Sequence, residues 1–358
     1  SLYTWYIERA GLQERNVECC TFDGLCKKLL ERNNLFLPGG KNAIEARRQA
    51  VMTALSNGKI KDKYYGIFID EVQMFETLWY KFAYNLLENK DNGDHIFVIC
   101  GDKTQEIKQR QKHGKAPWNA GEGYPVYRGG NKSIRIEKNF RNCVEINDYI
   151  NRYAQHARTL IKKHNPEEKF DPDMFLRGQA FRHGEGVTIK QFNGGALDEA
   201  KKVVESVKTI HDDKGVPYDE IAVAMYYRHY RPLKYYLESA LSKAFAKDHI
   251  PYNLLYNNDQ SWGGRYGDGG VSFITFDSVL GLDFQAVVVC GVKPLGAYDK
   301  TKQLKSEDIL DEEQTENLKK NISYLYVACT RAKDYLHIVL GESSSQSIYN
   351  KLLTASEE

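Results

Sequence analysis

The chain has 358 residues, and its 50 Lys and Arg nearly balance its 48 Asp and Glu, which gives a formal net charge of +2. At ~150 residues per domain, this length suggests about two domains. The charge balance excludes a histone-like tail or a polyelectrolyte arm but permits a local basic groove. No apolar run approaches the ~18 residues that span a bilayer, so we expect a cytoplasmic protein with no membrane partner.

Cysteine and histidine spacing argues against a dedicated metal site. The seven cysteines form no C-x-x-C pair, which favours reduced cytosolic thiols over a disulfide framework or a zinc site. The nine histidines show no H-E-x-x-H spacing. No G-x-S-x-G occurs either, which removes the best-known serine-hydrolase signature.

Short apolar runs alternate with longer amphipathic stretches, which is typical of α/β proteins with parallel sheets. We expect buried strands at 67–69, 96–100, 187–192, 221–225, 271–276, 286–290 and 336–340. We expect helices at 43–55, 197–210, 232–245 and 311–333. The Gly-rich, polar stretch 121–132 is the expected linker, which divides the chain into domains 1–130 and 131–358.

The first expected strand ends in two carboxylates, Asp70 and Glu71, followed by Gln73. The carboxyl edge of a parallel sheet is where α/β proteins bind ligands. In nucleotide hydrolases, an Asp at this place holds Mg²⁺, and a neighbouring Glu orients or deprotonates the attacking water. The string alone fits an acidic turn at a strand end equally well.

Later segments repeat this design. The strand expected at 96–100 is followed by G-D-x-x-Q, which contains Asp102 and Gln105. Further on, Arg141 lies in N-x-R and Arg331 in V-A-x-T-R-A-K. Two separated arginines fit the cationic clamp that stabilises charge on a transferring phosphoryl group.

In chain order, D-E-x-Q, G-D-x-x-Q, N-x-R, T-x-x-S-x-x-G-L-x-F and V-A-x-T-R-A-K closely resemble the motifs of superfamily 1 helicases of the UvrD/Rep type. Upstream, Thr21-Phe22-Asp23 resembles the T-F-H segment of that family. The resemblance spans residues 17–341. It implies an α/β fold of two RecA-like P-loop NTPase domains with parallel sheets, the first one N-terminally incomplete.

The resemblance also implies ATP and Mg²⁺ as cofactors. Asp70 would bind Mg²⁺, and Glu71 would activate the hydrolytic water. Gln105 would contact the γ-phosphate, and Arg141 and Arg331 would be the two arginine fingers. The other nucleotide-site residues that it implies are Gln73, Asp102 and Asp283.

The partner implied by the resemblance is single-stranded DNA or a junction of single and double strands. Thr21, Phe22, Thr275 and Ser278 would lie near the strand path. Trp118 stands where relatives keep an aromatic that stacks on a base, an interaction worth ~1–3 kcal/mol, although ordinary packing explains this residue equally well. We expect a monomer.

Three departures from the family pattern bear on activity. No G-x-x-x-x-G-K-[ST] phosphate loop occurs, so ATP lacks its main anchor. We expect that loop in a longer parent protein, ahead of Ser1. Asp23, Asp277 and Leu280 stand where the family has His, His and Lys, which predicts weak DNA binding.

Two functional hypotheses remain. The first is an ATP-dependent DNA helicase or translocase of the DNA-repair type, inactive as this chain alone because the phosphate loop is missing. The second is a catalytically dead nucleic-acid-binding or regulatory module that kept the helicase fold. The stretch between Arg141 and Thr275 is accounted for by one core domain, and 33–62 leaves room for only a reduced accessory insertion.

Overall fold

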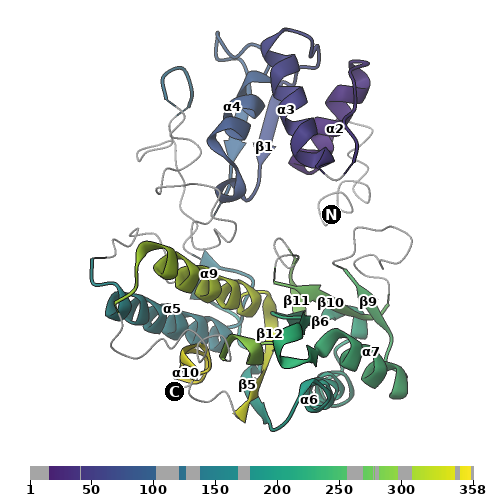
Figure 1. Cartoon of the computed structure of the whole chain (residues 1–358), viewed down its shortest axis with the longest axis vertical. Helices are drawn as coiled ribbons and strands as arrows, with labels where there is room; N and C mark the ends of the chain where they lie inside the picture. Colours follow the sequence, from purple (N-terminus) through teal and green to yellow (C-terminus); the bar gives the residue numbers. More distant parts are fainter. Residues whose placement is uncertain are drawn as a thin grey trace. The chain divides into compact units, whose positions relative to one another are not determined.

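The computed structural model describes residues 16–40, 42–101, 121–125, 138–167, 178–255, 269–276, 278, 282–296, 309–342 and 347–355. These residues belong to two compact units, which meet in the sequence between Ser133 and Ile134 (Figure 1). Most of the linker expected at 121–132 lies outside the described residues. Among the described residues, no helix is both long enough and apolar enough to cross a bilayer.

The first unit consists of helices packed on a two-stranded sheet. Its elements are α2 (Phe22–Arg32), α3 (Ala43–Ser56), β1 (Gly66–Ile69), the 3-10 turn η2 (Val72–Met74), α4 (Thr77–Asn85) and β2 (Ile96–Ile99). β1 and β2 are parallel, with Gly66 opposite Ile96 and Ile69 opposite Ile99. The segment expected as a reduced accessory insertion, 33–62, supplies α3, which packs on α2.

The two faces of this small sheet differ. Ile67 and Ile69 on β1, with Phe97 and Ile99 on β2, face a core that includes Tyr80 of α4. On the opposite face, Phe68, Ile96 and Val98 are 71%, 42% and 38% exposed. Because successive residues of a strand point to opposite faces, one apolar face of the sheet is buried and the other is open.

The second unit is built on a six-stranded sheet in the order β5-β12-β11-β6-β10-β9, in which every pair is parallel. Its strands are β5 (Gly186–Phe192), β6 (Ile221–Met225), β9 (Tyr252–Leu254), β10 (Val271–Thr275), β11 (Phe284–Cys290) and β12 (Ala332–Gly341). Its main helices are α5 (Val144–His164), α6 (Ala196–Lys208), α7 (Leu237–Lys247), α9 (Glu312–Cys329) and α10 (Ile348–Ala355). Two short pairs lie outside the sheet: β3 (Lys138–Asn139) with β4 (Gln179–Ala180), and β7 (His229–Tyr230) with β8 (Tyr235–Tyr236).

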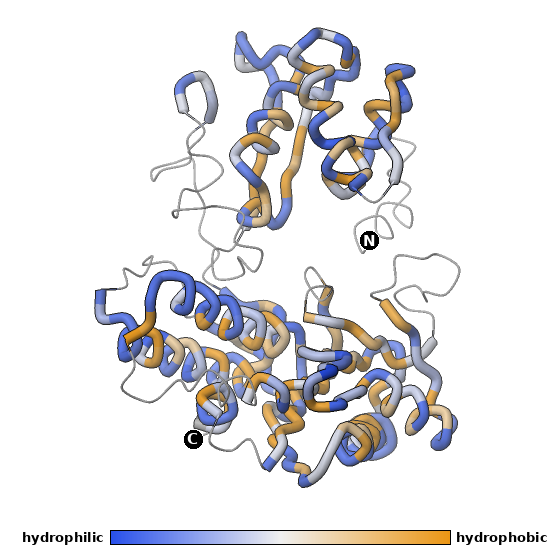
Figure 2. The backbone as a smooth tube through the Cα atoms, viewed as in Figure 1, coloured by the Kyte–Doolittle hydropathy of each residue, from blue (hydrophilic) through white to orange (hydrophobic). Residues whose placement is uncertain are grey.

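Helices cover both faces of the large sheet. All five residues of β6 are buried; Ala222 and Ala224 join the core under α5 and α9, whereas Ile221 and Val223 join the core under α6 and α7. Figure 2 shows the strands of this unit as largely hydrophobic. Near-continuous apolar strands are what a parallel sheet between two helical layers requires.

The α/β fold with parallel sheets is therefore confirmed, and all seven expected strands are present. Two expected helix boundaries are wrong. The helix expected at 232–245 begins at Leu237, because the preceding residues form a 3-10 turn (Arg231–Leu233) and β8. The helix expected at 311–333 ends at Cys329, because Ala332 already pairs with Phe284 in the sheet.

Candidate nucleotide and nucleic-acid site

In the first unit, the structure brings the D-E-x-Q segment against the end of the neighbouring strand. The Cys100 amide donates to the Ile69 carbonyl at 2.8 Å, and the Val72 amide donates to the Cys100 carbonyl at 2.9 Å. Burial, and secondarily the Asp70 carboxylate, raise the pKa of the Cys100 thiol. Asp70 and Cys100 therefore lie at the same carboxyl edge, as the register of two parallel strands predicts.

The turn that follows Asp70 holds Glu71 in a defined position. Glu71 has a left-handed backbone (φ 52°, ψ 42°), which is uncommon outside glycine and is retained where surroundings impose it. The Gln73 Nε2 group, on a side chain only 2% exposed, donates to Glu71 Oε2 at 2.5 Å. A buried amide thus orients a carboxylate at the sheet edge.

Gly101 allows this arrangement. A Cβ atom at this position would lie 2.5 Å from Gln73 Oε1 and 2.9 Å from Val72 Cγ1. Since those distances are shorter than van der Waals contact, only glycine fits here without displacing the D-E-x-Q turn. The glycine of G-D-x-x-Q therefore leaves the space that the Gln73 side chain of D-E-x-Q occupies.

A metal at this edge would have few protein ligands. Among the described residues, no group of three or more His, Cys, Asp or Glu side chains gathers where it could hold a metal ion. Mg²⁺ in nucleotide sites uses one or two carboxylates, with waters and phosphates as the other ligands. The exposed Asp70 carboxylate fits that role.

The Thr21-Phe22-Asp23 segment also has local structural roles. Thr21 is the N-cap of α2, and its Oγ1 accepts a hydrogen bond from the Gly24 amide at 3.1 Å. The Phe22 ring stacks on Trp79, with centroids 4.7 Å apart and planes 17° apart. These contacts give Thr21 and Phe22 roles within the protein, beside the DNA contact expected for them.

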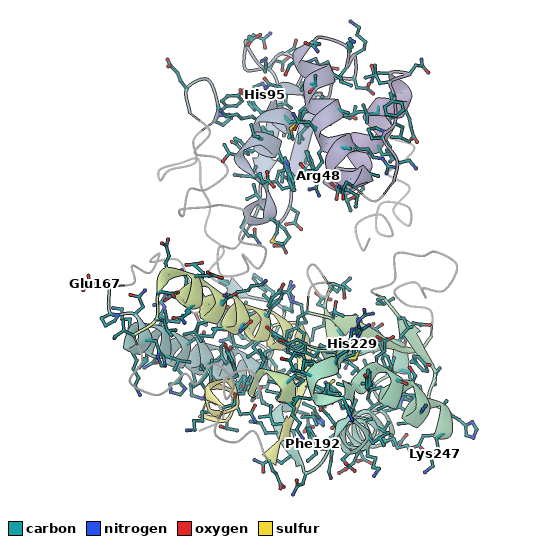
Figure 3. The ribbon with its side chains drawn as sticks, in the orientation of Figure 1. Arg48, His95, Glu167, Phe192, His229 and Lys247 are labelled. Atoms are coloured by element: carbon teal, nitrogen blue, oxygen red, sulfur yellow. The ribbon has the colours of Figure 1, made fainter. Side chains whose placement is uncertain are left out.

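Asp23 does not stand as an uncompensated negative charge. Its carboxylate receives two hydrogen bonds from Arg48, from Nε at 2.6 Å and from Nη2 at 3.1 Å. The Arg48 guanidinium, labelled in Figure 3, also lies 4.4 Å from the centroid of the Trp79 ring. The negative charge of Asp23 is thus neutralised by a cation on the neighbouring helix.

In the second unit, the N-x-R and T-R-A-K segments are joined by hydrogen bonds. Asn142, one residue beyond Arg141, donates from Nδ2 to the carbonyls of Thr330 (3.1 Å) and Ala332 (2.5 Å). The Arg141 amide donates to Asn139 Oδ1 at 3.1 Å. Two motifs about 190 residues apart, as the Asn142 and Ala332 pair shows, are therefore neighbours in space.

Asp283 lies between two cations of these motifs. Its Oδ2 is 3.5 Å from Arg141 Nε, and its Oδ1 is 2.9 Å from Lys333 Nζ. All three side chains are about one-third exposed, so a ligand can reach them. The structure thus brings together Arg141 and Asp283, two of the expected nucleotide-site residues.

Arg331 differs from Arg141 in exposure. It is only 1% exposed, and its guanidinium donates to the Val327 carbonyl (3.1 Å) and to Thr330 Oγ1 (3.3 Å). These hydrogen bonds hold the Arg331 guanidinium against the C-terminal end of α9.

Thr275 and Ser278 form a turn at the end of β10. Ser278 Oγ accepts hydrogen bonds from the Thr275 amide (2.9 Å) and from Thr275 Oγ1 (3.1 Å), and it donates to the Thr275 carbonyl (3.0 Å). Both hydroxyls are thus used by the turn, although Thr275 also lines a groove.

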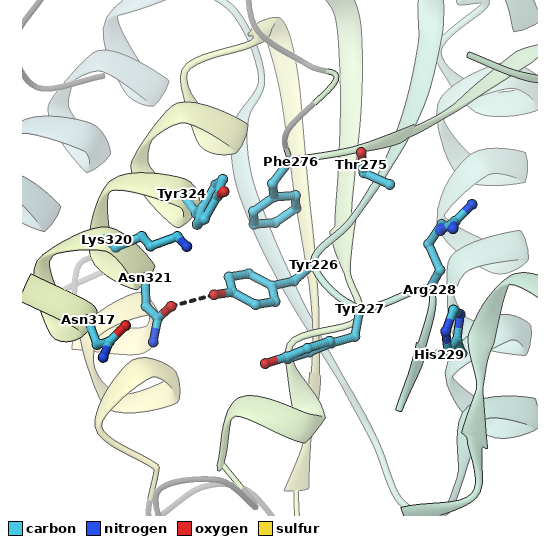
Figure 4. A pocket seen from close by; sticks show the side chains of 10 residues that line it. All are labelled: Tyr226, Tyr227, Arg228, His229, Thr275, Phe276, Asn317, Lys320, Asn321 and Tyr324. Carbon is cyan, nitrogen blue, oxygen red and sulfur yellow. Dashed lines mark hydrogen bonds between the residues drawn. The ribbon is translucent and has the colours of Figure 1, made fainter. Parts of the chain in front are cut away.

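This groove has a volume of about 520 Å³ and lies at the carboxyl ends of β6 and β10, beside α9 (Figure 4). Its wall after β6 is aromatic and basic; the lining residues are Tyr226, Tyr227, Arg228, His229, Thr275, Phe276, Asn317, Lys320, Asn321 and Tyr324. Except for Thr275, these residues carry no motif that was recognised as a site in the sequence. The signal was available, because Tyr-Tyr-Arg-His follows a buried strand just as Asp-Glu does.

Several expected residues cannot be placed. Asp102, Gln105 and Trp118 lie outside the described residues, as do Asp277 and Leu280. Their roles stay predictions.

Comparison with known proteins finds similar structures but no sequence family. No protein-family model matches the chain, and no curated protein is detectably similar to it. Among solved structures, the chain is similar to the C-terminal domain of a possible DNA helicase from Lactobacillus plantarum WCFS1. The match has a TM-score of 0.30 and 15% identity, and it covers 56% of this chain and 87% of that one. This similarity is too low to transfer a function.

Proposed function

We propose that this chain is the motor core of an ATP-dependent DNA helicase or translocase of the UvrD/Rep type, with Mg²⁺ and ATP as cofactors and single-stranded DNA as partner. The observation that carries the proposal is the Asp70–Gln73 turn, which is hydrogen-bonded to Cys100 and lies close to Gly101 at the carboxyl edge of two parallel strands. Nucleotide hydrolases use this edge for metal and water activation.

The chemistry expected of this turn follows from its geometry. Asp70, exposed at the edge, is the ligand for Mg²⁺, which when bound neutralises charge on the phosphates. Glu71 is the group that accepts the proton of the attacking water. The buried Gln73 amide donates to Glu71 Oε2 and so holds this carboxylate in one orientation. A general base that is held in place loses less freedom on reaching the transition state.

The second unit carries both candidate arginine fingers, Arg141 and Arg331. Arg141 is held beside Asp283 and Lys333, and the motif that contains it is tied to the motif that contains Arg331. Any change that moves Asn142 therefore moves both arginine-bearing segments together. Such mechanical linkage suits two groups that must act on one phosphate.

A second candidate is the catalytically inactive nucleic-acid-binding module. One observation favours it: the Arg331 guanidinium is hydrogen-bonded inside its own unit. The two candidates predict different nucleotide binding. The motor should bind nucleotide more tightly with Mg²⁺, through Asp70, whereas the inactive module should not.

The test measures binding of a fluorescent ATP analogue to the full chain with and without Mg²⁺. If the motor assignment is right, Mg²⁺ strengthens binding and Asp70→Asn removes that gain, a loss of about 10-fold or more because a metal ligand is lost. Asp91→Asn, which makes the same change in an exposed turn of the first unit, is the matched control and should bind as the wild type does. Hydrolysis by this chain should be negligible.

A second measurement separates the candidates. Anisotropy of labelled dT20 should report weak binding with a shallow dependence on salt, given a net charge of +2. Binding of dT20 together with Mg²⁺-independent nucleotide binding would favour the inactive module. Absence of both binding activities would contradict both candidates.

A further inference from the structure

Glu199 is a buried carboxyl group outside the residues assigned above. It lies in the first turns of α6 with 0% exposure. The Tyr235 hydroxyl donates to its Oε2 at 2.6 Å, and the Gly291 amide donates to its Oε1 at 2.7 Å. Both carboxylate oxygens are therefore engaged by groups from elements far apart in the sequence.

The part of the groove wall that follows β6 is the segment 226–230. The Gly291 contact fixes the start of this segment. The Tyr226 amide donates to the Cys290 carbonyl at 2.9 Å, and the Tyr227 amide donates to the Gly291 carbonyl at 3.2 Å. Gly291 has φ 75°, and a Cβ there would lie 2.8 Å from the Tyr227 carbonyl oxygen. The position of Gly291 thus sets the position of Tyr226 and Tyr227.

The Tyr235 contact fixes the other end of the same wall. Tyr235 in β8 pairs with Tyr230 in β7, and Tyr236 pairs with His229. Arg228, between the two ends, places its Nη1 3.3 Å from Glu238 Oε2. One buried carboxyl is therefore linked, through Gly291 and through Tyr235, to both ends of the segment 226–230. Four residues of this segment line the groove in Figure 4.

We propose that Glu199 is a positioning residue that fastens both ends of segment 226–230 and thereby sets the shape of the groove. The ligand that the groove takes, single-stranded DNA, rests on the proposed function. The positioning role itself rests only on the contacts of Glu199.

The ionisation of Glu199 makes this role measurable. Burial raises the pKa of Glu199 to about 7, against opposing effects of Tyr235, Gly291 and Lys293. The other titratable groups that act with it are Tyr235 of β8 and Cys290 of β11, whose own pKa values are raised well above the usual range. These two stay neutral between pH 6 and 8, whereas Glu199 changes charge.

The direction follows from linkage. The pKa of Glu199 is higher in the closed wall than in solvent, so the closed wall binds the proton more tightly. The closed wall is therefore most stable below pH ~4.3, loses stability as the pH rises from there to about 7, and changes little above that. With a pKa of ~4.3 for Glu199 in solvent, the equilibrium constant for opening of the 226–230 wall should rise about 10-fold between pH 6 and pH 8.

Amide hydrogen exchange of the full chain tests this inference through a peptide that covers 226–236. After correction for intrinsic exchange rates, wild-type protection of this peptide should fall about 10-fold from pH 6 to pH 8. Glu199→Gln stays neutral, and its amide can accept from Gly291 and donate to Tyr235. It should show no such fall and should be more protected than the wild type at both pH values, because its neutral amide has no ionised form that would favour the open wall.

Matched variants separate positioning from general stability. Glu205→Gln makes the same change on the same helix, at an exposed side chain paired with Lys202, and should keep the wild-type pH dependence. Glu199→Ala should lose protection at both pH values, and Gln should restore it. Should the Ala variant not fold, Tyr235→Phe removes one tie and should expose 229–236 more than 226–228.

Two results would overturn the inference: equal pH dependence in the wild type and Glu199→Gln, or a change spread evenly over peptides from α9. The affinity for dT20 is also measured at pH 6 and pH 8 as a functional test. The change in affinity between these pH values should persist in Glu205→Gln, and the part of it that comes from Glu199 should be absent in Glu199→Gln. If dT20 does not bind at all, the proposed function fails, but the exchange result still decides the role of Glu199.

Discussion

The parallel sheets of the two units differ in how much of their surface is covered by helices. In the second unit, the parallel sheet is covered on both faces, and every residue of β6 is buried. In the first unit, α4 covers one face of the parallel pair β1–β2, while Phe68 on the other face is 71% exposed. Parallel sheets normally have both faces covered. Apolar patterning therefore identifies a strand without showing that its two faces are covered.

The largest effect should come from the covered sheet. Phe273 of β10 is 0% exposed, stacks on Tyr252 at 4.7 Å and packs edge-on against Phe245 at 4.8 Å. Phe273→Ala should lower the free energy of unfolding of the second unit by about 3–5 kcal/mol, because it removes buried contacts and leaves a cavity. Urea unfolding followed by hydrogen exchange in peptides of each unit measures this. An equal loss in the first unit would contradict the division into two units.

The strands could be predicted because continuous β-branched runs have few other uses in an α/β chain. The helix boundary at Leu237 could not be predicted, because it depends on a tertiary contact. Tyr235, just before the helix, donates a hydrogen bond to Glu199, which lies 36 positions earlier in the sequence. Propensity alone favours continuing the helix backwards through 232–236. Distant partners override such local preferences.

The candidate site shows the same limit. Motif spacing singled out Asp70, Glu71 and Arg141 as candidates, and their roles at a nucleotide stay predictions. It could not show that Arg331 is buried, since exposure depends on the packing of α9 and β12. Nor did it identify Tyr227 and Arg228, because only the structure shows that the residues after β6 and the α9 helix face one groove.

A medium effect is expected where the first unit holds its candidate catalytic turn. Gly101→Ala would place a methyl group against Gln73 and Val72, so it should cost ~1–3 kcal/mol of the stability of the first unit. Fluorescence of Trp79 in the same unit can follow urea unfolding. Gly39→Ala is the control, because nothing lies within 4 Å of a Cβ there. Equal stability of the two variants would show that Gln73 moves away freely, and that Glu71 is not held.

The smallest effect should distinguish the two faces of β1. Phe68→Ala should change the free energy of unfolding by less than ~0.5 kcal/mol, since a side chain that is 71% exposed loses little burial. Its neighbour Ile69 is 6% exposed, so Ile69→Ala should cost ~2–5 kcal/mol in the same urea titration. If Phe68→Ala proves as costly as Ile69→Ala, the outer face of β1 is covered in solution. The contrast between the two sheets would then be one of strand number alone, because both sheets would be buried on both sides.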